Sequence, residues 1–184
     1  MTVRFFMLQS QYRSTLDFSN EALKAAHKGY KRLANALRIS KMLNYTPEAD
    51  VAIDEAKKLD IEKSIAGFYA AMNDDLNTSV GIAQLFNMLK YINMLNLGQL
   101  KFAALGEETV YQLKTQFTLF VEDVLGLKEE LSEGREVLDG MLQLYKEYKV
   151  AQNYEKVDQI RSYFKQQGLA IRDTKTKIEW AYEE

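Results

Sequence analysis

The C-terminal stretch of the sequence carries the three kinds of side chain that recognition of single-stranded RNA requires. Bases stack on flat rings, their pairing edges need hydrogen-bonding groups, and phosphates need cations. The rings are Tyr148, Tyr154, Trp180 and Tyr182, and the cations are Lys146, Lys149, Lys156, Arg161, Lys175 and Lys177. Asp158 and Asp173 add carboxylates, either of which can accept both donors on the pairing edge of guanine. We interpret this stretch as a candidate reader of unpaired bases.

Each of these side chains also has a plainer interpretation. Trp180 and Tyr182 alternate along an expected strand, so at least one of them is expected to pack a hairpin against its helices. Asp158 can pair with Arg161, which lies three positions further along an expected helix. The sequence leaves both alternatives open.

A second candidate contact with RNA is a helix without acidic residues. No Asp or Glu occurs between Ala22 and Thr46. At 100° per residue, four cations fall on the side opposite the apolar stripe: Lys24, Lys28, Lys31 and Arg38. An exposed helix usually mixes charges to gain pairs four residues apart, so an unmixed face suits a phosphate backbone. The alternative is a solvated cationic face.

The elements that position these residues are mainly helical. Apolar residues spaced three and four apart predict an antiparallel helical bundle over residues 1–126. Expected helix starts are Ser19 as a cap, Thr46 as a cap before Pro47, and Asn77 or Thr78 as a cap. The expected buried stripes are Leu23, Ala26, Tyr30, Leu33 and Leu37; Ile61, Ile65, Phe68 and Met72; Ile82, Leu85, Leu89 and Ile92; and Val110, Leu113, Phe117, Phe120 and Val124, ended by Gly126.

A small α+β domain is expected over residues 135–184, after a linker at residues 127–134. Its two helices should bury Val137, Met141, Leu144 and Tyr148, and Val157, Ile160, Arg161 and Phe164. Gly168 stops the second helix, and alternation at residues 169–172 and 178–182 then predicts a β-hairpin with residues 173–177 as its loop. A lone hairpin is barely stable in water, so it must pack on the two helices.

Composition narrows the classes of function. The 184 residues include no Cys and carry a net charge of −2, so disulfides and thiolate metal sites are excluded and any RNA contact must be local. No closely spaced glycines form a phosphate loop, the lone His27 is expected to be solvated, and we predict no catalytic residue. Asp74 and Asp75 suit a helix start or inter-helix hydrogen bonding better than a metal. No membrane segment or signal peptide is expected, and cytoplasmic localisation is predicted.

Three blocks of the sequence resemble bacterial cysteinyl-tRNA synthetases. Residues 3–19 resemble the family pattern R-F/Y-F-L…H-Y-R-S-x-L-N/D-Y/F-S, and residues 71–78 resemble A-M-D-D-D-F-N-T. The layout from a charged helix through Gly168 and Asp173 to Trp180 also agrees. Gln11 and Asn73 depart from the family's His and Asp. Because an apolar run begins almost at the first residue, we expect a C-terminal piece of a longer protein. The resemblance implies that its bundle is of the DALR type.

The resemblance implies specific roles. Aligned on Gly168, Asp173 and Trp180, it places anticodon contacts on Lys149, Tyr154, Asp158 and Asp173. We add Trp180 to the candidate anticodon-binding residues for its aromatic ring. Asp158 would read the guanine, Lys149 the cytosine and Asp173 the adenine of the cysteine anticodon, with Tyr154 stacking. The family usually has Arg and Trp where this chain has Lys149 and Tyr154.

The resemblance also implies the following partners: a cysteine tRNA and an N-terminal catalytic domain that brings ATP with magnesium and zinc. No cofactor is expected in this chain, which should be a monomer without ligase activity by itself. Arg4 and Arg13 are then candidate ties to the catalytic domain. Two alternatives remain: the bundle region of a cysteine ligase of mycothiol synthesis, and a helical scaffold for protein partners.

Overall fold

The computed structural model describes residues 1–128, 135–174 and 178–183. The chain divides into two compact units, Met1–Lys128 and Glu129–Glu184, which are described separately. Leu127 is buried in the first unit, and residues 129–134 of the predicted linker lie outside the described residues. Lys175 and Lys177, two of the predicted cations, also lie outside them. Within the described ranges, no helix has the length and apolar character needed to cross a membrane.

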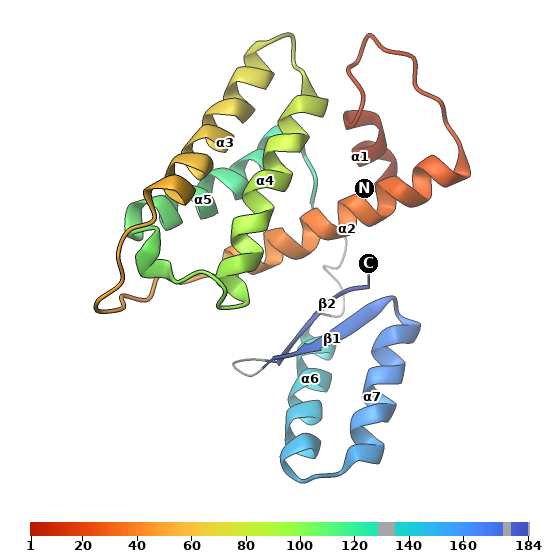
Figure 1. The fold of residues 1–184 in the computed structure, drawn as a ribbon. Coiled ribbons are helices and arrows are strands. Elements are labelled where there is room, and N and C mark those ends of the chain that lie inside the picture. Colours follow the sequence, from red (N-terminus) through yellow and green to blue (C-terminus); the bar gives the residue numbers. More distant parts are fainter. Residues whose placement is uncertain (129–134, 175–177, 184) are drawn as a thin grey trace. The chain divides into compact units, whose positions relative to one another are not determined.

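The N-terminal unit is a helical bundle (Figure 1). Its elements are α1 (Thr2–Leu8), α2 (Asn20–Met42), α3 (Glu55–Asn73), α4 (Thr78–Asn96), a 3₁₀ turn (Phe102–Ala104), α5 (Glu107–Thr118) and a π-helical segment (Leu119–Val124). Helices α3 and α4 pack side by side, and α2 contacts α1, α4 and α5. Phe68 and Phe120 stack at a ring-centroid distance of 3.9 Å inside the core. The predicted bundle is confirmed.

Local capping explains where most of these helices begin. The side chain of Ser19 accepts from the amide of Ala22, and Asn77 accepts from that of Val80, so both predicted caps are confirmed. The predicted start at Thr46–Pro47 is wrong. Residues 43–54 are not helical, and α3 begins at Glu55 because Asp54 accepts from the amide of Lys57.

The end of the bundle departs from a regular helix. Val110, Leu113, Phe117 and Phe120 are buried as predicted, whereas Val124 is 48% exposed. The π-helical segment inserts one extra residue into the turn, which rotates the following positions around the axis. Val121 and Leu125 therefore face the core in place of Val124.

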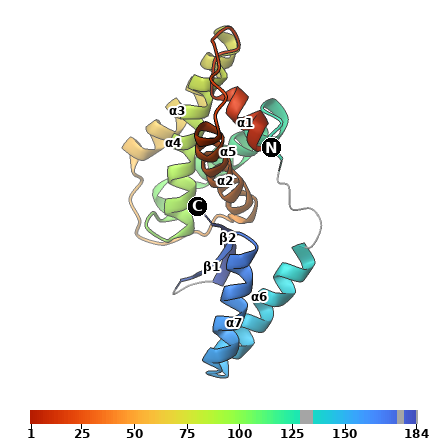
Figure 2. The ribbon, with the colours of Figure 1, turned by 90° about the vertical axis from the view of Figure 1, so that its right-hand side faces the viewer.

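The C-terminal unit consists of two helices and a two-stranded antiparallel sheet, as predicted. Helices α6 (Arg135–Val150) and α7 (Tyr154–Gln166) lie side by side in both views (Figures 1 and 2). Strands β1 (Leu169–Asp173) and β2 (Ile178–Tyr182) pair with Ile171 opposite Trp180, and they pack against α7 and α6 respectively. Gly168, at φ +69°, ends α7 as predicted. Asp173 belongs to β1 and not to the hairpin loop.

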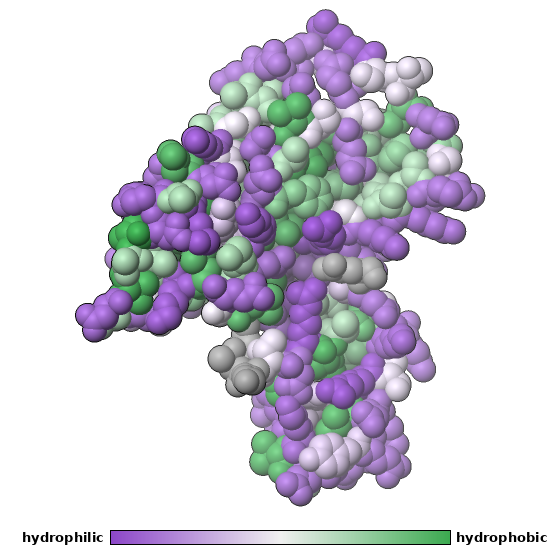
Figure 3. Space-filling model, in the orientation of Figure 1, coloured by the Kyte–Doolittle hydropathy of each residue, from purple (hydrophilic) through white to green (hydrophobic). Residues whose placement is uncertain are grey.

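The core of this unit corrects one predicted helix face. The buried residues on α6 are Leu138, Leu142 and Tyr145, whereas Val137 and Leu144 are 62% and 46% exposed. The predicted α7 residues Val157, Ile160 and Phe164 are buried and Arg161 is exposed. Outside this core the unit is polar, and hydrophilic residues make up most of its face in Figure 3.

Candidate nucleic-acid interface

Two of the predicted reader residues meet at a corner where α6 and β1 both end. Lys149 lies in the last turn of α6, and Asp173 is the last residue of β1. The Nζ of Lys149 donates to Oδ2 of Asp173 at 2.6 Å. This hydrogen bond is the main cause that lowers the pKa of Asp173 below its ordinary value. Asp173 therefore stays a carboxylate, and Lys149 pairs with it in this structure.

The buried phenol of Tyr145 forms a hydrogen bond with Asp173 of this pair. Tyr145 is 0% exposed, and its hydroxyl donates to Oδ2 of Asp173 at 3.1 Å. Nη2 of Arg161 donates to the same hydroxyl at 2.6 Å, and the guanidinium lies 5.4 Å from the centre of the Tyr145 ring. Burial is the largest effect that raises the pKa of Tyr145, so the phenol keeps its proton. In the described part of the chain, all contacts of Asp173 reach Oδ2, which leaves Oδ1 to accept another donor.

Helix α7 adds two exposed predicted residues to the same face. Tyr154, Asp158 and Arg161 are spaced four and three residues apart, so they share one side of the helix. Nη1 of Arg161 lies 3.8 Å from Oδ1 of Asp158, so the plainer pairing predicted for Asp158 is present. The Asp158 side chain is nevertheless 74% exposed, and Tyr154 is 63% exposed. We call Lys149, Tyr154, Asp158, Arg161 and Asp173 together the charged face.

Trp180 is not part of the charged face, so its predicted role in stacking on a base is wrong. Its ring is 2% exposed and belongs to the core of the unit, and Nε1 donates to Oδ1 of Asp139 at 3.2 Å. Tyr182 packs edge-on against it at 5.8 Å. The reason is that β2 turns these two alternating residues toward the helices, which is the plainer interpretation given above.

Sequence reasoning missed the contacts of Tyr145 with Asp173 and Arg161. It predicted Arg161 only as a cation, whereas the structure shows it in contact with Tyr145, Asp158 and Asp173. Helical spacing offered a signal, because Tyr145 precedes Lys149 by four residues and Arg161 follows Asp158 by three. The signal is weak because the same spacing also describes ordinary core and surface positions.

The predicted cationic face of α2 is shorter than expected. Lys24 and Lys28 are exposed, and in the described residues neither forms an ion pair. Lys31 is half-buried. Arg38 is only 4% exposed, so its predicted contact with a phosphate backbone is wrong. Residues 35–40 are buried on every side because this part of α2 enters the bundle between α4 and α5.

The two blocks 3–19 and 71–78 meet in the N-terminal unit. Asp75 accepts from Tyr12 Oη at 2.7 Å, Gln11 Nε2 at 3.2 Å and Arg13 Nη2 at 3.3 Å. Arg4 Nη1 donates to the carbonyl of Gly126 at 2.7 Å. Both arginines therefore tie parts of this unit together, and a tie to a catalytic domain stays a prediction. Asp75 serves inter-element hydrogen bonding, the interpretation favoured above over a metal.

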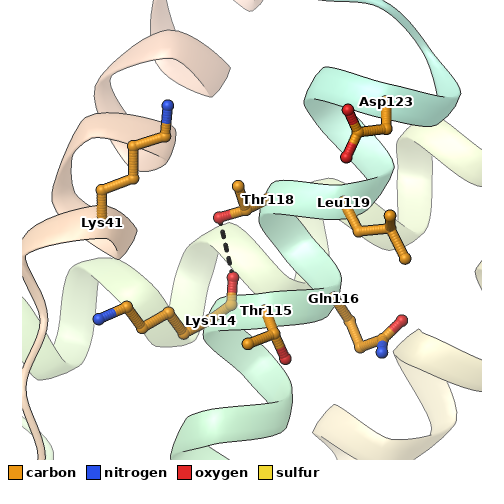
Figure 4. Close-up of a pocket in the computed structure, with 7 residues that line it drawn as sticks. All are labelled: Lys41, Lys114, Thr115, Gln116, Thr118, Leu119 and Asp123. Carbon is orange, nitrogen blue, oxygen red and sulfur yellow. Dashed lines mark hydrogen bonds between the residues drawn. The ribbon is translucent and has the colours of Figure 1, made fainter.

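A separate cavity of about 510 Å³ lies between α2 and α5 (Figure 4). Lys41 comes from α2, and the other lining residues come from α5 and the π-helical segment: Lys114, Thr115, Gln116, Thr118, Leu119 and Asp123. Lys41 pairs with Glu122 at 2.6 Å, and Lys114 donates to the carbonyl of Leu43 at 2.7 Å. Both cations are committed to the protein, so this cavity does not offer a ready anion site.

The described residues also bear on metal and catalytic chemistry. Among them, no group of three or more His, Asp or Glu side chains is arranged to hold a metal ion. His27 is exposed and its Nδ1 lies 2.8 Å from Oγ1 of Thr2. The chemistry that the charged face offers is recognition by hydrogen bonds, ionic contacts and stacking.

Sequence similarity to known proteins extends over both units of the chain. Residues 67–129 match the family described as the DALR domain. The whole chain is similar to cysteine–tRNA ligases, with 51% identity to that of Cytophaga hutchinsonii over 100% of this chain. The identity is 41% for Bacteroides thetaiotaomicron and 31% for Chlorobaculum tepidum, each over 98% of this chain. The chain spans only 37%, 36% and 37% of these three proteins. The resemblance to the cysteine–tRNA ligase family predicted from the sequence is confirmed.

Proposed function

We propose that this chain is the anticodon-recognition part of a cysteine–tRNA ligase. The observation that carries the proposal is a chain of ion pairs on the C-terminal unit, in which Arg161 joins Asp158 to Asp173 and Asp173 pairs with Lys149. Tyr154 lies on the same side of α7 as Asp158, four residues before it. That face combines an exposed ring, two carboxylates and two cations, which is the set that reading of unpaired bases requires.

The geometry suits a division of the anticodon among these residues. The exposed carboxylate of Asp158 accepts the two donors of guanine, and the ring of Tyr154 stacks on a base. Lys149 donates to cytosine and Oδ1 of Asp173 accepts the amino group of adenine. Cytosine and adenine are consecutive in the anticodon, and Nζ of Lys149 and Oδ2 of Asp173 are only 2.6 Å apart. A lysine offers one nitrogen where arginine offers a fork, so the cytosine contact is the less selective one.

The remaining parts of the proposal concern the parent enzyme. A catalytic domain elsewhere in the parent protein would bind ATP with magnesium and zinc, and attach cysteine to its tRNA in the cytoplasm. The present chain would be a monomer that supplies tRNA binding only. Lys24 and Lys28 on α2 contact the sugar–phosphate backbone. With ATP and cysteine alone, the chain should give no pyrophosphate exchange, and measurable exchange would contradict this.

Binding to anticodon stem-loop RNA tests the proposal. The wild-type chain should bind a stem-loop with the cysteine anticodon more tightly than one whose first anticodon base is adenine. Asp158→Asn should reduce that preference by about 1–3 kcal/mol, the worth of one good base contact. Replacing Lys24 and Lys28 by Gln should instead weaken binding of all complete tRNAs alike and reduce the salt dependence by about one to two ions.

Glu147→Gln is the matched control for the acidic variant. Glu147 is exposed on α6 and contacts Gln143, away from the charged face. It should leave the preference unchanged. Equal affinity of the wild-type chain for all anticodons, at any salt concentration, would refute anticodon recognition.

A further inference from the structure

Two residues have no role in base reading under the proposed function: Arg161 of the charged face, and the buried Tyr145 whose hydroxyl contacts both Arg161 and Asp173. We propose that Tyr145 and Arg161 are positioning residues: Tyr145 fixes Asp173, and Arg161 couples Asp173 to Asp158 so that the two carboxylates read their bases as one unit. This inference rests on the proposed function because it concerns the same face.

The case for Tyr145 begins with its rigidity. Its ring is fully buried in the core that includes Leu142 and Phe164, so the position of its hydroxyl is fixed by packing. A phenol has one proton, and this proton goes to Oδ2 of Asp173. The hydroxyl can therefore only accept from Arg161, and the direction of the chain from Arg161 through Tyr145 to Asp173 is determined.

The other partner of Asp173 is less suited to hold it in place. Lys149 reaches Asp173 through a flexible side chain that is 45% exposed, whereas the Asp173 side chain is only 16% exposed. If Lys149 turns to a base, its hold on Asp173 is lost. The rigid phenol then remains as the support that aims the carboxylate, which is how a preorganised binding group is held.

Arg161 reaches both carboxylates because its guanidinium has two arms. Nη2 donates to Tyr145 and lies 3.8 Å from Oδ2 of Asp173, while Nη1 lies 3.8 Å from Oδ1 of Asp158. Among the ion pairs of the described residues, Arg161 is the cation that joins these two acids. A lysine at this position keeps the charge but has one nitrogen, so it cannot bridge both.

These contacts predict different effects for the two residues. Tyr145 contacts Asp173 and not Asp158, so its hydroxyl should affect recognition of the third anticodon base. Arg161 contacts both acids and should affect the first and the third base. A general loss of structure would not separate the two bases in this way.

The test compares the complete chain and its variants on stem-loop RNAs changed at the first or the third anticodon base, with affinities measured by fluorescence anisotropy. Tyr145→Phe keeps the ring and should lower discrimination at the third base about fivefold, the effect of one hydrogen bond. Discrimination at the first base should fall less, because the hydroxyl reaches Asp158 only through Arg161. Arg161→Lys should lower both. Because Tyr145 acts through Asp173, adding Tyr145→Phe to Asp173→Asn should cause no further loss at the third base.

Tyr91→Phe is the matched control. The hydroxyl of Tyr91 also donates to a carboxylate, Oδ2 of Asp60 at 2.5 Å, but it lies in the N-terminal unit. This variant should change discrimination at neither the first nor the third anticodon base. Folding of the C-terminal unit can be checked through the fluorescence of the single tryptophan, Trp180. If Tyr145→Phe does not fold, Arg161→Lys and Arg161→Gln remain informative because Arg161 is half exposed.

The outcomes separate this inference from the proposed function. Suppose that Asp158→Asn and Asp173→Asn each reduce discrimination, while Arg161→Lys leaves discrimination at the first and at the third base within about twofold of the wild-type values. The positioning role of Arg161 is then refuted, and anticodon recognition stands. Loss at the first base in Tyr145→Phe, as large as that at the third, would also refute it. If neither acidic variant changes discrimination, the proposed function itself fails.

Discussion

Replacement of Trp180 by phenylalanine tests whether this ring supports the fold or contacts RNA. The change removes the hydrogen bond from Nε1 to Asp139, worth about 1 kcal/mol. It also removes about two carbon atoms' worth of buried apolar surface, a further 1–2 kcal/mol. The unit spans Glu129–Glu184, so its total stability should be roughly 3–8 kcal/mol. Trp180→Phe should therefore lower the free energy of unfolding by about 2–3 kcal/mol and leave the unit folded.

The assay has two readouts because fold and binding must be separated. Urea unfolding followed by the amide NMR signals of α6 and α7 should show the destabilisation. Affinity for the stem-loop RNA, measured without urea, should stay at the wild-type level because the ring is only 2% exposed.

Tyr154→Ala is the opposite case. Its 63% exposed ring contributes little to the core, so stability should hold while RNA affinity falls by about 1–3 kcal/mol. If folded Trp180→Phe loses as much RNA affinity as Tyr154→Ala, the burial argument is refuted.

Three further predictions concern single contacts. Gly126→Ala should lower the free energy of unfolding by about 2 kcal/mol in the urea assay, because φ is +62° and the added Cβ would lie 2.5 Å from Nη1 of Arg4, whose hydrogen bond would be lost. Its control is Gly98→Ala, at φ +68° with nothing within 4 Å of the added Cβ, which should cost only about 1 kcal/mol. Asp75→Ala should destabilise the bundle by about 1–2 kcal/mol in thermal unfolding followed by circular dichroism, and the neighbouring Asp74→Ala by clearly less, whereas equal effects would contradict the role of the three hydrogen bonds. Because Lys149 lowers the pKa of Asp173 from its ordinary 3.8, the stability this group adds should be complete above that value and fall as pH drops through the lower folded pKa; Trp180 fluorescence should show a shallower acid loss in Lys149→Met.

Features set by a few neighbouring residues could be predicted from the sequence. Ser19 and Asn77 cap their helices through an amide three residues away, so the signal and the structure lie in the same short segment. Gly168 and the alternation after it likewise predicted the end of α7 and the hairpin. The failed start at Thr46–Pro47 shows the limit of such signals, because the chain stays non-helical until a second capping residue, Asp54.

Features decided by tertiary packing were predicted less well. On α6, apolar residues occupy adjacent positions such as Leu144 and Tyr145, so two stripes satisfy the same helical period. Packing against α7 and the hairpin selected the stripe that contains Tyr145. Arg38 failed for a related reason: a helical projection assumes one exposed side along the whole helix, whereas the second half of α2 is enclosed.

Most residues of the candidate site could be predicted from the sequence, but the hydrogen bonds between them could not. Ion pairs through Arg161 connect Lys149, Asp158 and Asp173, and Trp180 is buried in the core, while the anticodon roles of the three paired residues and of Tyr154 stay predictions. The hydrogen bonds through Tyr145 could not be read from the sequence because they join α6, α7 and β1. Only the fold determines which side chains from separate elements share an oxygen atom.

The charge balance of the charged face implies that base selectivity and salt-dependent affinity come from different residues. Lys149 and Arg161 are matched by Asp173 and Asp158, so the face has no net charge with which to attract phosphates. Selectivity between bases and salt-dependent affinity must then come from different residues, since the second depends on the number of phosphates neutralised. Lys24 and Lys28, without ion pairs among the described residues, are suited to supply it. A variant of the charged face that keeps this balance, such as Arg161→Lys, should therefore change which RNA is preferred at every salt concentration without changing the slope of affinity against salt.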